Sequence, residues 1–511
     1  MMIRLFLLSL VLPLLAVPAE AAWRKASSEH FVVYSDQSEG DIRDFAENLE
    51  KYHSAMAYIT QKGEGPVSPS NRVTIFVLRN QRALRGLYGN RSSFVAGFYS
   101  SRAGASVAFV TRVEDGVGTE LSFSETVMLH EYAHHFMYSY YGYTFPLWYQ
   151  EGFAEFYASA GFDFDGSVRI GRPNNHRADE LFDIRPVPVE MLLDTAAYKK
   201  ARKEQGRYDS FYVRSWLLFH YLTMDNFSPR PERKGQLLRY LQNLGRGMKP
   251  IEAATKAFGP LDALEKDLRK YARRRPMRIF DVPAKDIKIG EITVQTLSEG
   301  AGEVMPLLMR SRRGVDAEQA TALLPQVREV AAKYPDDPFV NAALAEAEYD
   351  AGNDAEAVAA ADRTLAVEPG NMDAHRQKIF ATFRLAEAAD GEAEKPAWKT
   401  ALRAISAANA LEPDNPIPLM HYYRSYSARG MPAPELAKQA LEQALGLAPY
   451  DKGLRMNVAN QQIFDGRYSY ARFTLQPLLL DPHNSGFSSL AQEMLTKIEG
   501  KQDRDKSNAD N

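Results

Sequence analysis

The chain has 511 residues, 45% of them hydrophobic, 25% charged and 11% aromatic, which allows roughly two to four domains and excludes disordered, collagen-like and low-complexity chains. The 62 Lys and Arg residues nearly balance the 65 Asp and Glu residues, for a net charge of -3, so the overall charge predicts no nucleic-acid partner. No cysteine is present, which excludes disulfides, thiolate metal sites and lipoprotein anchors and leaves His and carboxylates as the metal ligands to expect.

Residues 1–21 predict a cleavable signal peptide. Arg4 precedes an apolar run over residues 5–17, and residues 19–21 (AEA) form a small-residue ending, the order typical of secretory signals. The run is too short for the roughly 30 Å of hydrocarbon that a permanent span crosses. An uncleaved anchor is the alternative. We expect a periplasmic or secreted protein with no stable transmembrane segment and no lipobox cysteine.

Strand and helix patterns alternate from residue 22 to about residue 280, which predicts an α+β domain. Residues 30–36 and 72–79 are short runs rich in β-branched and aromatic residues, typical of strands, and an amphipathic helix is predicted over 41–59 between them. Residues 94–110 predict two strands around a Ser/Gly turn. This hairpin is either a structural element or an edge strand that can bind a peptide.

Residues 130–134 form an H-E-x-x-H motif within a predicted helix. His130 and His134 differ by only about 40° around the helix axis, so both imidazoles can face one metal ion. Glu131 is turned about 100° from His130 and can take a proton from a water molecule at that ion. A chance match in a chain of this length has odds of about one per cent, so the surrounding sequence must support the motif.

A second predicted helix begins near residue 150 with the sequence QEGFAEF. Glu151 can supply a third metal ligand, and Glu155, one turn later, can accept a hydrogen bond from the free ring nitrogen of a ligating histidine. Two histidines and one carboxylate leave a fourth position open, as in catalytic zinc sites, although other divalent ions accept the same ligands. The alternative is that both glutamates are solvated charges on a helix face.

The segments LHEYAH (129–134) and PLWYQEGFAEF (146–156) resemble the gluzincin peptidases, in particular the peptidase-MA-like group and the aminopeptidase N type. The resemblance implies a zincin-like α+β metallopeptidase domain over residues 22–280. It also implies that Glu151 completes a Zn²⁺ site with the two motif histidines and that Glu131 is the general base.

The segment YVRSWLLFHYL (212–222) is similar to the helix that begins with the transition-state tyrosine of the aminopeptidase type. The resemblance implies that Tyr212 donates a hydrogen bond to the oxyanion of the tetrahedral intermediate. Tyr208 is an alternative, and either tyrosine could simply be a packed aromatic. The G-A-M-E-N element of that family does not occur upstream, so endopeptidase action is favoured over amino-terminal recognition.

A linker is predicted over residues 281–315, followed by Ala-rich helices over 316–498. Successive helical runs end at prolines spaced by 33 to 44 residues: Pro335, Pro369, Pro413, Pro449 and Pro482. The longest spacing becomes regular if residues 387–396 form an insertion loop. This period resembles the tetratricopeptide repeat (TPR), which implies a solenoid whose concave face binds a protein or peptide. The alternative is a spacer or lid on the first domain. Residues 499–511 predict a flexible tail.

The sequence therefore predicts an α+β zincin-like metallopeptidase domain followed by an all-α TPR-like helical solenoid. The predicted function is a secreted or periplasmic zinc-dependent endopeptidase that cleaves protein or peptide substrates, with repeats that bind protein. One alternative is a non-catalytic periplasmic TPR scaffold with a metallopeptidase-like zinc-binding domain, and another is a metal hydrolase of non-peptide substrates. Glu131 favours an enzyme, because a site kept only for zinc affinity has no use for a base.

Overall fold

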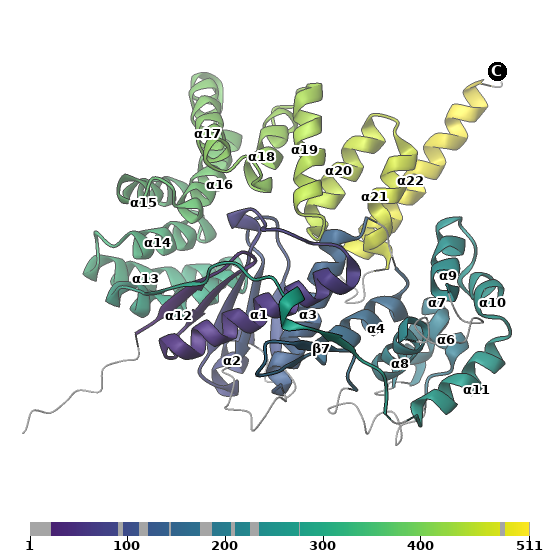
Figure 1. Cartoon of the computed structure of the whole chain (residues 1–511). Helices are drawn as coiled ribbons and strands as arrows, with labels where there is room; N and C mark the ends of the chain where they lie inside the picture. The colour runs from purple at the N-terminus through teal and green to yellow at the C-terminus, as the bar shows by residue number, and fades with distance from the viewer. Residues whose placement is uncertain are drawn as a thin grey trace, which may run out of the picture.

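The computed structural model describes residues 22–89, 96–111, 121–142, 145–173, 186–205, 210–224, 235–274, 276–480 and 486–509. The predicted signal peptide and Tyr208 lie outside these residues. A central sheet carries helices on both faces, a group of shorter helices lies beside it, and the C-terminal helices form an arc above it (Figure 1). None of the helices in the described ranges combines the length and the apolar character that a membrane crossing requires.

The main sheet has six strands in the order β4-β5-β3-β2-β1-β9. Their bounds are β1 Arg24–Ser27, β2 Phe31–Ser35, β3 Val73–Leu78, β4 Gly97–Ser100, β5 Val107–Thr111 and β9 Thr293–Thr296. Strands β2, β3 and β5 are parallel, whereas β1, β4 and β9 pair antiparallel to their neighbours. The strands predicted within 30–36 and 72–79 and the hairpin predicted within 94–110 are confirmed. Strand β4 forms one edge of the sheet.

The sheet is buried on both faces, because alternate side chains of its central strands pack in opposite directions. Phe31, Val33 and Ile75 belong to a core cluster with helices of one face, and Tyr34 and Phe76 belong to the cluster on the other face. The helices of the first face are α1 (Glu39–Thr60) and α3 (Phe123–Tyr140). The second face is covered by α2 (Gln81–Tyr88), α12 (Glu299–Arg312), α13 (Ala317–Lys333) and α14 (Pro338–Asp350).

The linker predicted over residues 281–315 is instead part of the folded core. Strand β9 pairs with β1 and completes the sheet, and α12 buries Val304 and Met305 in the cluster on the second face. Strand β8 (Phe280–Val282) joins a smaller sheet with β6 (Gly161–Phe162) and β7 (Val168–Ile170). The α+β region therefore continues beyond residue 280, because its sheet is finished by chain that follows this boundary.

Shorter helices gather at one side of the sheet, next to α4 (Figure 1). Their bounds are α4 Leu147–Ala158, α6 Val189–Leu193, α7 Thr195–Gln205, α8 Phe211–Met224, α9 Gln236–Gly245, α10 Pro250–Phe258 and α11 Leu261–Ala272. Helix α8 packs along α4, and α3 packs against the other side of α4. This three-helix contact positions the side chains of the H-E-x-x-H and E-G-x-A segments.

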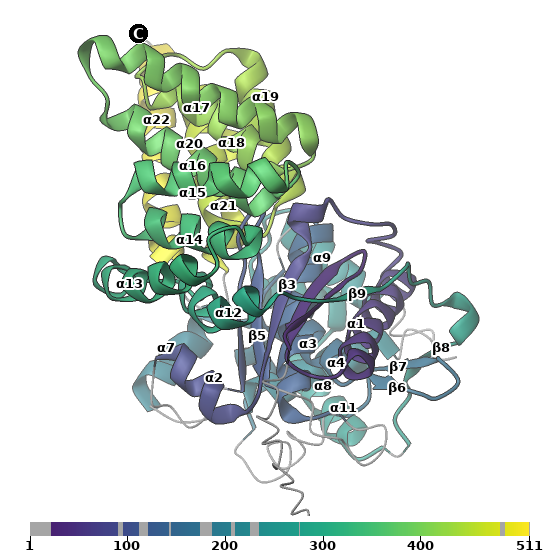
Figure 2. The same cartoon turned by 90° about the vertical axis from the view of Figure 1, so that its left-hand side faces the viewer.

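The second half of the chain is a stack of helix pairs of the TPR-like kind, and Figure 2 shows it as a block on the sheet. After α14 its helices are α15 Asp354–Val367, α16 Met372–Ala388, α17 Gly391–Leu411, α18 Pro416–Ser427, α19 Glu435–Leu447, α20 Lys452–Phe464, α21 Tyr468–Leu479 and α22 Gly486–Ala509. Pro369, Pro413 and Pro449 lie in turns between pairs, where their missing N–H groups cost no helical hydrogen bond.

One prediction for this half is wrong. Residues 387–396 do not form an insertion loop, because α16 continues to Ala388 and α17 begins at Gly391. Their Ala- and Glu-rich composition has high helix propensity, so the extra residues lengthen two helices. Helix α22 continues to Ala509, so residues 499–509 of the predicted tail are helical, and the flexibility of the tail stays a prediction.

Candidate metal centre

Helices α3 and α4 bring the three predicted metal ligands together. The Nε2 atoms of His130 and His134 lie 3.2 Å apart. Glu151 Oε2 lies 3.4 Å from Nε2 of His130 and 3.5 Å from Nε2 of His134. One ligand atom from each residue falls within 4.8 Å of the others. Atoms about 2 Å from a shared tetrahedral ion lie roughly 3.3 Å from one another, so this spacing fits one ion.

Local sequence explains where both helices begin. Ser122 and Glu125 form a capping box, in which Glu125 N–H donates to Ser122 Oγ at 3.2 Å and Ser122 N–H donates to Glu125 Oε2 at 2.8 Å. Helix α4 begins at Leu147, before the predicted start near residue 150, directly after Pro146. A proline is tolerated at a helix start because that N–H has no helical partner.

Gly152, next to Glu151, allows α4 to lie against α8. A Cβ atom at this position would lie 2.5 Å from the carbonyl oxygen of Ser215 and 2.8 Å from Cβ of Phe219. Any larger residue would therefore force the two helices apart. The same packing brings Tyr212, at the start of α8, to 6.4 Å between its ring centroid and that of His130. Tyr212 thus lies beside the cluster, as the resemblance implies for the transition-state tyrosine.

The cluster is buried, so its charged groups shift one another's pKa values strongly. Only 1% of Glu151 and 3% of His134 is exposed. Burial alone would raise the pKa of Glu151, but His134 first, and then His130, hold the pKa of this carboxyl well below its usual range. Burial alone would lower the pKa of His130, but Glu151 and Glu155 raise it to about 10. The cluster therefore stabilises added positive charge.

The donor set fits a divalent cation. Glu151 Oε2 is buried and, within the described residues, accepts no hydrogen bond, although both imidazoles face it. A buried carboxylate oxygen without a donor is costly unless a cation satisfies it. Glu155 Oε1 lies 3.4 Å from Nδ1 of His130, on the ring edge opposite the shared centre. This is the place from which a carboxylate can orient a ligating imidazole, as predicted for Glu155.

A cleft of about 530 Å³ opens beside the cluster and is lined by Glu131 and His134 of α3. Tyr99 and Ser100 of the edge strand β4 line the same cleft. The predicted base thus faces a space that can hold a substrate, next to one proposed ligand. His135, which follows His134, also lines the cleft but is not part of the three-residue cluster, and its Nδ1 lies 2.6 Å from the hydroxyl of Tyr99.

The C-terminal repeats close the opposite side of this cleft. Residues from the turn before α20 to the start of α22 line it, and Tyr450 packs its ring 4.5 Å from that of His135. Ala103 N–H donates to Asp451 Oδ2 at 2.7 Å. Gln150 Nε2 donates to the carbonyl of Leu480 at 3.0 Å. The predicted lid-like packing is therefore present, and α20 and α21 come down toward α3 and α4 (Figure 1).

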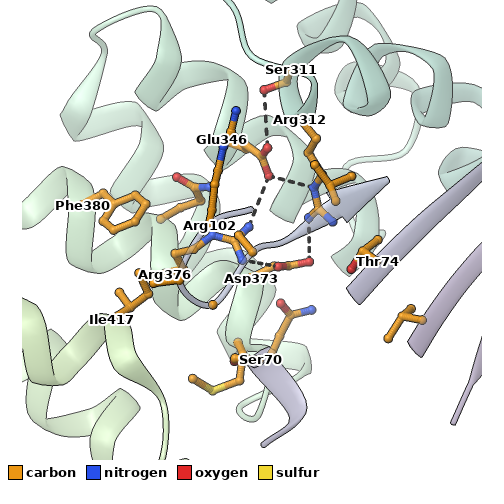
Figure 3. A pocket seen from close by; sticks show the side chains of 18 of the residues that line it. Ser70, Thr74, Arg102, Ser311, Arg312, Glu346, Asp373, Arg376, Phe380 and Ile417 are labelled. Atoms are coloured by element: carbon orange, nitrogen blue, oxygen red, sulfur yellow. Dashed lines mark hydrogen bonds and ion pairs between the residues drawn. The ribbon is translucent and has the colours of Figure 1, made fainter. Parts of the chain in front are cut away.

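A larger cavity, of about 860 Å³, lies between the sheet and the helices α12, α14, α16 and α18 and does not contain the metal cluster. On its helical wall, Arg312 donates to Asp373 at 2.7 Å and to Glu346 at 3.3 Å, and Arg376 donates to Asp373 at 2.7 Å. Figure 3 shows these ion pairs, with Thr74 of β3 nearby. The two cavities share Arg102 and Asp451 as wall residues.

Sequence reasoning found the ligand set but missed the residues that the repeats contribute to the cleft. Tyr450, Asp451 and Arg455 lie about 300 residues from His134 in the chain. They follow the turn at Pro449, which the repeat period predicts. The period does not predict which of the turns contacts the first half of the chain. Gly152 is the glycine of the E-G-x-A pattern. The structure explains why a glycine stands there, because α4 packs closely on α8 at this position.

No protein-family model matches the chain, and no curated protein matches it. Solved structures of helical-repeat proteins do. TTC0263, a thermophilic TPR protein of Thermus thermophilus, is 20% identical with a TM-score of 0.33, over 38% of this chain and 98% of that chain. MamA of Desulfovibrio magneticus RS-1, from residue 41 to its end, is 17% identical with a TM-score of 0.28, over 37% and 100%. Human IFIT1, as a dimer with m7Gppp-AAAA, is 15% identical with a TM-score of 0.26, over 63% and 74%.

The helical-repeat character of the second half rests on its own helix pairs. The resemblance of the α3 and α4 segments to gluzincin peptidases stays a prediction.

Proposed function

We propose that this helical-repeat protein carries a Zn²⁺-dependent endopeptidase site that cleaves protein or peptide substrates. The observation that supports the proposal is the convergence of His130, His134 and Glu151 on one centre beside a cleft that Glu131 lines. Export to the periplasm or to the outside of the cell, through the signal peptide predicted at residues 1–21, belongs to the same proposal.

Each residue has a separate role. His130, His134 and Glu151 would hold the ion, which when bound polarises a carbonyl and makes a water molecule more acidic. Glu131 would take a proton from the attacking water as the new C–O bond forms, and pass it to the amide nitrogen as the C–N bond breaks. Tyr212 would donate a hydrogen bond to the oxyanion. Glu155 would keep the ring of His130 in one tautomer and orientation.

The walls of the cleft support a polypeptide substrate. Strand β4 is an edge strand that pairs with β5 alone among the described strands, so its other side can pair with an extended chain. Its residues Tyr99 and Ser100 line the cleft next to Glu131. The repeats supply the facing wall, so a substrate in this cleft would contact both halves of the molecule.

The decisive experiment compares the full chain with its Glu131→Gln variant. After loading with zinc, bound metal is measured by plasma mass spectrometry and hydrolysis is measured with an unfolded fluorescent protein. We expect equal zinc in both proteins and a loss of hydrolysis by about 10²- to 10⁴-fold in the variant, since a positioned general base contributes that much.

Glu252→Gln is the matched control, because Glu252 is an exposed glutamate on α10 that pairs with Lys256 at the surface of that helix. Its zinc content and hydrolysis should equal those of the unsubstituted chain. Hydrolysis that survives in Glu131→Gln would remove this glutamate from the mechanism. Normal zinc binding without hydrolysis in any of the proteins would contradict the enzyme.

The second candidate is a non-catalytic scaffold, in which the repeats bind a protein partner and the cluster binds metal for structure. The similarity to repeat proteins favours this reading, and so does the polar cavity of about 860 Å³ beneath the helices. In that case zinc removal would lower the melting temperature while partner binding by the repeats persisted.

A further inference from the structure

Arg455 is an unusual wall residue of the metal cleft. It lies on α20, in the wall that the repeats contribute, and lines the same cleft as Glu131 and His134. Its guanidinium donates from Nη2 to the carbonyl of Pro449 at 2.6 Å and from Nη1 to the carbonyl of Thr474 at 3.3 Å. These two main-chain acceptors fix the side chain in place.

No carboxylate pairs with Arg455 among the residues that the structure describes. Burial lowers the pKa of Arg455 to about 10, and the ionisable side chain that opposes this shift is Tyr138. Buried guanidinium groups are normally paired with an acid, because desolvating the charge is costly. The two main-chain contacts use two of the five N–H donors of an arginine, which leaves capacity for a further acceptor.

Asp451, the acid of the same wall, binds other partners. Asp451 Oδ2 accepts the N–H of Ala103 at 2.7 Å, and its Oδ1 accepts the N–H of Leu454 at 2.8 Å as the cap of α20. Arg102, between β4 and β5, and Lys452, on α20, also line the cleft, so positive charge is present on both of its sides. An anionic ligand would satisfy this wall, and guanidinium groups recognise carboxylates with two parallel hydrogen bonds.

We propose that Arg455 binds a carboxylate of the substrate, so that the cleft selects peptides with an acidic side chain or a free carboxyl terminus near the bond to be cleaved. This inference rests on the proposed function, because it takes the cleft beside the cluster as the substrate site. Arg455 is then a specificity residue supplied by the repeats, about 320 residues after the H-E-x-x-H motif.

The test measures binding without turnover, in the zinc-loaded full chain carrying Glu131→Gln. Fluorescence anisotropy compares three versions of one labelled peptide: a neutral version with an amidated carboxyl end, a version with one Gln replaced by Glu, and a version with a free carboxyl end. We expect at least one acidic version to bind about tenfold more tightly than the neutral peptide, as charge-assisted hydrogen bonds predict. The tighter version identifies the source of the carboxylate.

Adding Arg455→Met should remove the preference, whereas Arg455→Lys should keep part of it, because the positive charge remains. Arg467→Met is the control: Arg467 is an arginine of the same repeat, but it pairs with Glu442 at 2.6 Å and does not line the cleft. Thermal melting of each variant checks that it folds. Equal binding of all three peptides, or a preference that survives Arg455→Met, overturns the inference.

The two proposals fail separately. Hydrolysis by the active chain without any preference for acidic peptides would remove the role of Arg455 and leave the enzyme. A preference that depends on Arg455, in a chain that hydrolyses nothing, would keep the carboxylate site and remove the peptidase.

Discussion

Two buried groups of charges in this molecule are organised in opposite ways. On the wall of the larger cavity, Arg312 and Arg376 share Asp373 at 2.7 Å each, so every charge faces an opposite charge from the same chain (Figure 3). At the metal centre, two imidazoles and Glu151 Oε2 face one another at 3.2 to 3.5 Å, and this oxygen accepts no hydrogen bond within the described ranges.

The difference separates a structural network from a binding site. In the arginine network, burial alone would raise the pKa of Asp373, but Arg312 and then Arg376 keep it well below its usual range, so the network is complete as folded. The histidine cluster has one ligand atom from each of three residues within 4.8 Å of the others, an arrangement that could hold a cation. Strong pKa perturbation occurs in both, so geometry, and not the size of the shift, distinguishes them.

The largest effect should come from removing a ligand of the metal centre. His130→Ala and Glu151→Ala should lose zinc almost completely, because two remaining ligands bind weakly. Glu155→Ala should lower zinc affinity by only about 10- to 100-fold, the usual cost of losing a residue that orients a ligand. Zinc titration with a competing chelator measures all three affinities. Equal retention in the three variants would mean that the ligands are wrongly assigned.

Arg312→Met should instead leave zinc binding intact and destabilise the fold. It leaves Glu346 and Asp373 with Arg376 as their remaining arginine partner, so the loss of the charged hydrogen bonds of Arg312 should cost about 1.5 to 3 kcal/mol. Arg467→Met is the matched control, since Arg467 pairs with Glu442 and their side chains are 39% and 40% exposed, and it should cost less than about 1 kcal/mol. Urea unfolding gives both values. Similar losses in the two variants would contradict the structural role of the network.

The sequence predicted the convergence of His130, His134 and Glu151 because the information for it is local. The spacing of His130 and His134 follows from one turn of helix, and Glu151 follows within one short connection. The arginine network could not be predicted in this way. Arg312 and Asp373 come from helices separated by three other helices in the chain, and no periodic pattern states that their side chains meet.

The same limit explains the errors in the fold. The α+β region seemed to end near residue 280 because the composition changes there, yet β9 returns to pair with β1. Strand pairing across about 270 residues depends on the exposed edge of β1, which is a property of the folded sheet. The docking of Tyr450 on His135 is likewise set by the curvature of the whole stack, which single repeats do not encode.

The smallest expected effect is the pH dependence that Asp350, an acid next to Glu346 of the arginine network, adds to stability. Burial, and then the nearby Glu346, raise the pKa of Asp350 from 3.8 to about 6, although the Ser311 hydroxyl, Arg102 and Arg376 oppose the shift. Between pH 3.8 and about 6 the folded state therefore keeps a proton that the unfolded state has lost. The contribution of Asp350 to the free energy of unfolding should therefore fall as the pH rises through this window and level off above it.

Asp350→Asn isolates this contribution, because the variant cannot titrate at this position. The free energy of unfolding of the unsubstituted chain minus that of the variant should fall by about 2 kcal/mol from about pH 4 to about pH 6. Each pKa unit corresponds to roughly 1.4 kcal/mol, and partial solvent exposure lowers the expected value. Urea unfolding of the metal-free proteins across this range measures it. Parallel stability profiles would show that Asp350 is ionised in the fold throughout, and the network would then hold one more negative charge than its arginines balance.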